Sequence, residues 1–289
     1  MSNTSSQSIL LPDVAETGML TFYCHAIESQ HPDPILRDEK AVEISRQLNP
    51  VFANSSSRLL QRLAKGRVSK ELVVHITLRA KKYDEYALSF LNKHPGGVIV
   101  NIGCGMDSRF HRVDNGQATC FDLDLPEMIE FKKRFYEETE RYHFIGASVF
   151  DYAWMDQVAD LGPRPVLFMA EGVFMYLDAV KVKELVLKLR SRFPGSELVC
   201  EVVSERYTRK PWNRMVSMKL NRQIGAGQGA SFTFGIRTDR EMETWHSGIE
   251  FLDAWSYFDS GHPRLGWMGV MGKMKFMRNV QYTVHYRLN

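Results

Sequence analysis

The chain has 289 residues, of which 44% are hydrophobic and 25% charged, and a formal net charge of +3. This length allows one large or two small domains, and the near balance of charge excludes the strongly basic proteins that bind phosphate backbones, so we expect no nucleic-acid partner. No segment has the pattern of a signal peptide, and the most apolar window, residues 166–177, is too short to span a bilayer. We therefore predict a cytoplasmic protein without membrane contact.

The cysteines also bear on location and metal content. They are widely spaced and form no CxxC motif, a pattern typical of reduced, buried thiols. We expect a reducing compartment, no disulfide framework and no structural metal.

Residues 13–92 show helical periodicity, with apolar residues recurring at intervals of three and four. The clearest helix begins near Ser69, a favourable N-cap, and ends at residues 92–97, where a proline and two glycines cannot continue it. Its buried stripe includes Arg79, and a half-buried guanidinium is costly unless it meets a carboxylate. We predict an N-terminal helical extension over residues 1–94.

The pattern changes after residue 95. Short β-branched runs alternate with helices, which predicts a parallel, doubly wound α/β sheet over residues 95–289. The predicted strands are residues 98–102, 119–123, 144–147, 166–170 and 197–203, with helices over 126–141 and 178–193. Strict alternation of apolar residues over 280–286 predicts an added antiparallel strand. Residues from about 206 to 246 break the alternation and are predicted to be an insertion covering one end of the sheet.

A short glycine-containing loop, Gly103-Cys104-Gly105, follows the first predicted strand. Glycines there allow a ligand to approach the backbone at the carboxyl edge of the sheet, although many tight turns need glycine for steric reasons alone. The dinucleotide fingerprint GxGxxG would require a glycine at position 108, which is Ser108. The loop therefore favours a ligand other than a dinucleotide.

The second and third predicted strands also end in polar residues. Asp124 lies 21 residues after Gly103, where an acid typically holds ribose hydroxyls. Asp122 lies on the same face of its strand, and we predict that it caps the helix opening at Pro126. Ser148 and Val149 follow the third strand, where a loop flanks the base of a bound nucleoside.

Three further residues are candidates for chemistry. Glu171 interrupts an apolar strand, and an internal salt bridge and a ligand contact explain it equally well. Tyr176 follows it, and aromatic packing is the commoner role of such a residue. Arg109 could orient an acceptor carboxylate or form a salt bridge with Asp107 or Asp122.

Four segments in order, NIGCGMDSRF, FDLDLPEMIEFKKRF, GASVFDY and MAEGVFMYL, with Arg79 upstream, resemble the leucine carboxyl methyltransferase family, and especially its polyketide carboxyl O-methyltransferase branch. The resemblance extends from residue 17 to the C-terminus. It implies a Rossmann-like methyltransferase fold that uses S-adenosylmethionine. In this fold a seven-stranded, mostly parallel sheet carries an antiparallel C-terminal strand, and the helical extension covers the cofactor site.

The resemblance also implies roles for single residues. Arg79 would bind the carboxylate of the methyl donor, Asp124 its ribose, and Glu171 its amino group or the reacting centre. Ser148 departs from the acidic residue of the protein-methylating members. The implied cofactor-binding set is Arg79, Gly103, Cys104, Gly105, Asp124, Leu125, Ser148, Val149 and Glu171, and the candidate catalytic residues are Glu171, Tyr176 and Arg109.

The acceptor is inferred from acid–base chemistry. A carboxylate is ionised at neutral pH and needs no general base, whereas a phenol does, and the motifs contain no histidine. We therefore predict methylation of a carboxylate on a small aromatic or polyketide-like metabolite, with Tyr176, Tyr207 and Trp267 as possible walls of its site. The alternatives are methylation of a protein C-terminus, a nicotinamide-dependent oxidoreductase and a non-catalytic nucleoside-binding module. The sequence leaves the oligomeric state open.

Overall fold

The computed structural model describes residues 15–214, 218, 231–272 and 274–289. Four helices precede the sheet: α1 (Ala15–Glu28), α2 (Glu39–Ala53), α3 (Arg58–Ala64) and α4 (Lys70–Lys93). Ser69 caps α4 by accepting a hydrogen bond from the Leu72 N–H, and the helix ends just before Pro95. The predicted start and end of this helix are confirmed.

The seven strands form one mixed sheet in the order β3-β2-β1-β4-β5-β7-β6. The first five are parallel, and β7 runs antiparallel to both of its neighbours. The fold class is therefore as predicted. The strands are β1 (Val98–Ile102), β2 (Thr119–Asp124), β3 (Tyr142–Gly146), β4 (Val166–Ala170), β5 (Ser196–Val203), β6 (Ile249–Trp255) and β7 (Gln281–Leu288).

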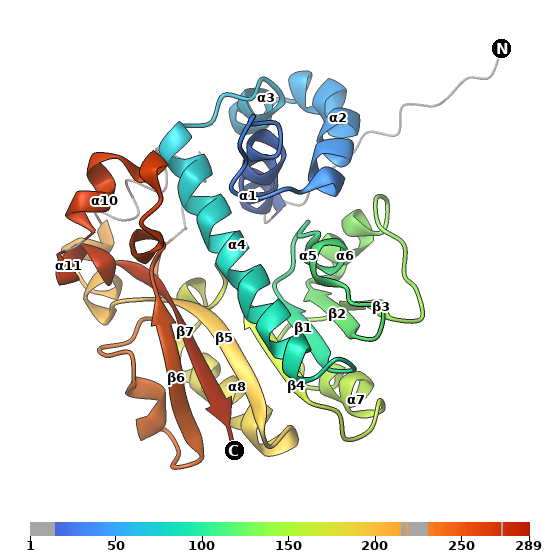
Figure 1. Ribbon diagram of the computed structural model, residues 1–289, viewed down its shortest axis with the longest axis vertical. Helices are drawn as coiled ribbons and strands as arrows, with labels where there is room; N and C mark the ends of the chain where they lie inside the picture. Colours follow the sequence, from blue (N-terminus) through green and yellow to red (C-terminus); the bar gives the residue numbers. More distant parts are fainter. Residues whose placement is uncertain (1–14, 215–217, 219–230, 273) are drawn as a thin grey trace.

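Helices cover both faces of the sheet. In Figure 1, α4 runs across one face, and the helices α1 to α3 lie beyond its N-terminal half. Alternate strand residues divide the core: Val199 of β5 packs with the α4 side, and Leu198 and Cys200 pack with α8 (Ala179–Arg192) on the other side. Asn101, Asp122, Glu197 and Glu201, which alternate with residues of the α8 side, therefore face α4.

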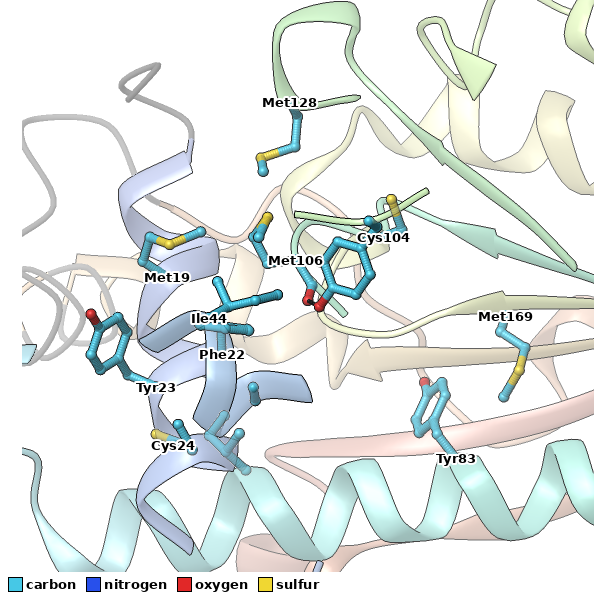
Figure 2. Packing of buried hydrophobic residues seen from close by; sticks show 14 of the residues in the cluster. Met19, Phe22, Tyr23, Cys24, Ile44, Tyr83, Cys104, Met106, Met128 and Met169 are labelled. Carbon is cyan, nitrogen blue, oxygen red and sulfur yellow. Dashed lines mark hydrogen bonds between the residues drawn. The ribbon is translucent and has the colours of Figure 1, made fainter. Parts of the chain in front are cut away.

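The N-terminal helices and the glycine loop share one apolar cluster. Figure 2 shows Met19 of α1 near Ile44 of α2, with Met106 and Met128 beside them. Tyr83 of α4 points toward the end of β4, where its hydroxyl donates to the Ala170 carbonyl over 3.3 Å. This packing places the helical extension directly over the carboxyl edge of the first strands.

The remaining helices are short. They are α5 (Arg109–Val113), α6 (Pro126–Lys132), α7 (Trp154–Ala159), α10 (Trp267–Met271) and α11 (Lys275–Arg278). The prediction of one helix over 126–141 is wrong, because α6 ends at Lys132. Three glutamates follow within residues 137–140 and would be unfavourable at the negative end of a helix dipole. Glu138 instead accepts the Phe144 N–H of β3.

Two expectations concern residues after β5. The predicted insertion at about 206–246 falls partly on residues 215–217 and 219–230, which lie outside the described residues. The strand β6 was not predicted: only its first residue is buried, so its sequence lacks the alternation of a half-buried strand.

The thiols of Cys24, Cys104, Cys120 and Cys200 are all buried and free. No helix in the described part of the chain is long and apolar enough to cross a membrane.

Candidate functional site

The loop after β1 is shaped by glycine. Gly103 has a φ of +66°, and a Cβ there would lie 2.4 Å from Val173 Cγ2, so no other residue fits. Gly105 also has positive φ, but nothing lies within 4 Å of the position its Cβ would occupy. One glycine thus packs tightly against the segment after β4, and the next leaves its backbone open to a ligand. Cys104 between them is buried, which raises the pKa of its thiol well above the usual value.

Asp124 connects this loop to its neighbours. Its Oδ2 accepts the Gly105 N–H over 2.7 Å, and its Oδ1 accepts the Leu125 N–H over 2.8 Å. Its carbonyl accepts the Ala147 N–H over 2.9 Å, which ties in the loop after β3. Burial raises the pKa of the Asp124 carboxyl above its usual range, although the two backbone donors oppose the shift. The side chain therefore stands where the three strand ends meet.

Asp122 has a different environment. Its Oδ2 lies 2.5 Å from Nζ of Lys132, a side chain with no exposed surface, and accepts the Tyr142 hydroxyl over 2.5 Å. The prediction that Asp122 caps the helix at Pro126 is wrong: Leu125 is the N-cap of α6, and no side chain bonds there. Asp122 instead neutralises Lys132, because a buried ammonium group requires a carboxylate partner. The sequence around Lys132 did not indicate that this side chain is buried.

Arg79 meets two carboxylates. Its Nε donates to Glu171 Oε1 over 2.8 Å, and its Nη1 donates to Glu201 Oε2 over 3.0 Å. The internal salt bridge that the sequence left open for Glu171 is therefore present. Burial alone would raise the pKa of Glu171, but the charges of Arg79 and Arg109 outweigh it and hold that pKa below the usual range. Glu201, on β5, was missed because it lies within a strand predicted only as apolar core.

Arg109 is 2% exposed and fully occupied by protein groups. Its Nε lies 3.0 Å from Asp84 Oδ1, its Nη1 2.6 Å from Asp107 Oδ2, and its Nη2 2.5 Å from Glu171 Oε2. Of the alternatives left open for Arg109, the structure shows the salt bridge with Asp107 and none with Asp122. It gives no support to Arg109 as the group that orients an acceptor.

The ion pairs of Arg79 and Arg109 form one charged cluster, made up of Arg79, Asp84, Asp107, Arg109, Glu171 and Glu201. A second part of this charged cluster comes from the N-terminal helices. His25 Nδ1 lies 3.0 Å from Asp38 Oδ2, the same oxygen that accepts the Ser108 hydroxyl and Arg112 Nη1. His25 is 3% exposed, and its Nε2 has no hydrogen-bond partner among the described residues. No motif in the sequence singled out His25, which lies on the buried face of α1.

The other predicted residues have their own surroundings. Ser148 is exposed, and the Val149 carbonyl accepts the Trp154 indole N–H over 3.1 Å. Tyr176 is 38% exposed beside Phe232, and Trp267 is 71% exposed. Tyr207 is buried in a small apolar cluster, which leaves Tyr176 and Trp267 as the accessible aromatic rings of the predicted acceptor set.

The charges of the cluster suit a cationic ligand. Three guanidinium groups, of Arg79, Arg109 and Arg112, pair with five carboxylates, so negative charge is in excess. The carboxylates belong to Asp38, Asp84, Asp107, Glu171 and Glu201. S-adenosylmethionine carries an ammonium, a sulfonium and one carboxylate, and its net positive charge complements this excess. Within the described residues, no group of three or more His, Cys, Asp or Glu side chains is arranged to hold a metal ion.

Comparison with known proteins identifies the family. The leucine carboxyl methyltransferase model matches residues 19–189. The chain is 30% identical over 270 residues to the tetracenomycin polyketide synthesis O-methyltransferase TcmP of Streptomyces glaucescens, covering 91% of this chain and 92% of TcmP. It is 25% identical over 252 residues to the S-adenosyl-L-methionine-dependent methyltransferase dpfgK of Gibberella zeae, covering 85% and 83%.

A solved structure supports the fold alone. A DUF574 family protein of Streptomyces avermitilis superposes with a TM-score of 0.57 at 12% identity, covering 93% of this chain and 97% of that one. The chain therefore belongs to the leucine carboxyl methyltransferase family, and it is an S-adenosylmethionine-dependent methyltransferase.

Proposed function

We propose that this enzyme methylates a carboxylate of a small aromatic or polyketide-like metabolite. The observation that carries the proposal is the similarity to a polyketide O-methyltransferase over nine-tenths of both chains. The exposed apolar side chains agree with it. Trp267 and Val270 of α10 are exposed, and so is nearby Met274. The segment that carries them leads into β7, whose first residue, Gln281, pairs with Val203 at the carboxyl end of β5.

We assign the donor site to residues at this same edge. Arg79 binds the donor's carboxylate, Asp124 its ribose, and Glu171 its amino group. The open backbone at Gly105 lines its methionine part, with Gly103 and Cys104, and the Ser148–Val149 loop borders the adenine. When bound, S-adenosylmethionine supplies an electrophilic sulfonium methyl group. Leu125 continues the ribose site through its N–H bond to Asp124.

The protein's part in the reaction is geometric. An acceptor carboxylate is already ionised at neutral pH, so the chain has only to hold it in line with the methyl group and to exclude water. The helices α1 and α2 cover the glycine loop, since Met19 and Ile44 pack with Met106 of that loop. Tyr176 stands on the segment directly after Glu171 and is our candidate for contact with the acceptor.

We expect S-adenosylhomocysteine to stabilise the protein and NAD to leave it unchanged. At a concentration 100 times the dissociation constant, a ligand adds about 2.7 kcal/mol, which for a chain of this size raises Tm by about 5 °C. Differential scanning fluorimetry measures the Tm of the protein with each of the two ligands. A shift with NAD and none with S-adenosylhomocysteine would contradict the assigned donor site.

We expect the product to be a methyl ester formed at a rate nearly constant from pH 6 to 9, because the acceptor is ionised throughout this range. The measurement is transfer of labelled methyl from the donor to a panel of aromatic carboxylic acids and matched phenols, followed by mild alkali, which cleaves esters and spares aryl ethers. Alkali-resistant label and a rate that climbs with pH would point to a phenol instead.

A further inference from the structure

A buried carboxylate on β5 carries an inference beyond the assigned donor site. Glu201 is 2% exposed and lies on the face of the sheet toward α4, since its strand neighbours Cys200 and Val202 pack on the opposite side. Its Oε2 accepts Arg79 Nη1 over 3.0 Å, and its Oε1 accepts the amide of Gln281 on β7 over 2.7 Å. Glu201 is thus held between the arginine of α4 and the antiparallel strand.

Arg79 pairs with two carboxylates, those of Glu171 and Glu201, although one would neutralise its charge. A single arginine is neutralised by one acid, and burying a second carboxylate costs free energy. Burial and the nearby charge of Glu171 raise the pKa of Glu201 above its usual range, against the opposing effect of Arg79. Glu171 is shared with Arg109, whereas Arg79 is the only cation that Glu201 pairs with among the described residues, so any effect of Glu201 is exerted through that guanidinium.

The backbone beside the pair suggests what that role is. Gly172 follows Glu171 directly, and the position of its missing Cβ lies 3.6 Å from Arg79 Nη2 and 3.6 Å from Glu201 Oε2. Among the described residues Arg79 Nη2 has no hydrogen-bond partner, so one arm of the guanidinium remains for a ligand. Glu171 also pairs with Arg109 and can turn to a ligand while that second pair persists.

We infer that Glu201 is a positioning residue for the methyl donor: it holds Arg79 in place to receive the donor's carboxylate when Glu171 is drawn to the donor's amino group. The inference rests on the proposed donor site and adds to it a group that does not touch the ligand. Gln281 fixes the other oxygen of Glu201, so strand β7 takes part in recognition of the donor.

The chain offers a matched control on the same strand and face. Glu197 is 6% exposed and accepts His285 Nε2 of β7 over 2.8 Å, but it has no contact with Arg79. Glu201→Gln and Glu197→Gln each replace one buried carboxylate of β5 by an isosteric amide. Their effects on folding are therefore comparable, and their effects on the donor should differ.

The experiment is calorimetric titration of both variants and the unchanged protein with two ligands. S-adenosylhomocysteine has the amino-acid group, and 5′-methylthioadenosine has the same nucleoside without it. We expect Glu201→Gln to weaken binding of S-adenosylhomocysteine about tenfold, as when one charge-assisted hydrogen bond is lost, and to leave 5′-methylthioadenosine unchanged. Glu197→Gln should change neither. In turnover, Glu201→Gln should raise the KM for the donor and leave kcat at saturating donor unchanged.

Equal weakening of both ligands by Glu201→Gln would show a general disturbance of the fold and overturn the inference, as would unchanged binding of S-adenosylhomocysteine. Failure of the unchanged protein to bind S-adenosylhomocysteine would instead contradict the donor site itself. The two failures are therefore distinct.

Discussion

Arg79→Met should lower the affinity for S-adenosylhomocysteine by one to two decades, because the pair between this guanidinium and the donor's carboxylate contributes about 1.5–3 kcal/mol. The substitution also leaves Glu171 and Glu201 without a shared cation. Breaking a buried pair typically costs about 3–5 kcal/mol, which corresponds to a fall in Tm of about 6–10 °C. Glu171 retains Arg109 and Glu201 retains Gln281, so we expect the fold to survive.

A second substitution separates the two effects. In Arg79→Met/Glu201→Gln the excess buried charge is removed, and much of the lost Tm should return while the affinity stays low. Recovery of affinity together with Tm would mean that Arg79 only neutralises its protein partners, and its role in donor binding would have to be given up. Calorimetric titration and thermal unfolding of the same preparations provide both quantities.

Asp122→Asn and Asp124→Asn should have opposite consequences, although the residues are two positions apart on β2. Asp122→Asn leaves the fully buried Lys132 without its carboxylate, and we expect a loss of about 3–5 kcal/mol of unfolding free energy with donor affinity largely kept. Asp124→Asn removes a carboxylate whose burial raises its pKa, so the loss of stability should be smaller. Its donor affinity should fall by about a decade or more, because the ribose loses a charged acceptor.

The measurements are urea unfolding for stability and titration with 5′-methylthioadenosine for the ribose contact. That ligand keeps the ribose and lacks the amino-acid group, so it isolates Asp124 from Arg79. An Asp124→Asn variant that binds it normally would remove Asp124 from the ribose site. A stable Asp122→Asn variant would show that the hydrogen bond that Lys132 already donates to the Asp107 carbonyl, over 2.6 Å, is enough to hold its charge.

Much of the sheet could be predicted because its strands are short, β-branched and separated by clear turns. The ranges predicted for β1 and β4 match the structure residue for residue. The edge strand β6 could not be predicted, because only its first residue, Ile249, is buried and the strand therefore lacks the alternation of a half-buried strand. The early end of α6 could not be read from the apolar periodicity, which continues past Lys132; the pair of this last helical residue with Asp122 is known only from the packed fold.

The same distinction applies to the site. Gly103, Asp124 and Glu171 stand at strand ends, where local pattern alone marks them. Glu201 and His25 carry no such mark, because a polar residue inside an apolar run is informative only once its partner is known. Their partners, Arg79 and Asp38, lie 122 and 13 residues away in the chain. Contacts of this kind are set by the packed fold rather than by local sequence.

The position of β7 has a consequence for how the protein is made. This strand is the last of the sheet in chain order, yet it lies inside the sheet, between β5 and β6. While the chain emerges from the ribosome, the outer side of β5 stays an unpaired edge, which is prone to join the strands of other chains. Only when Gln281 and the residues after it are inserted does Glu201 gain its second partner. The ability to recognise the donor and protection from aggregation are thus acquired in the same late step.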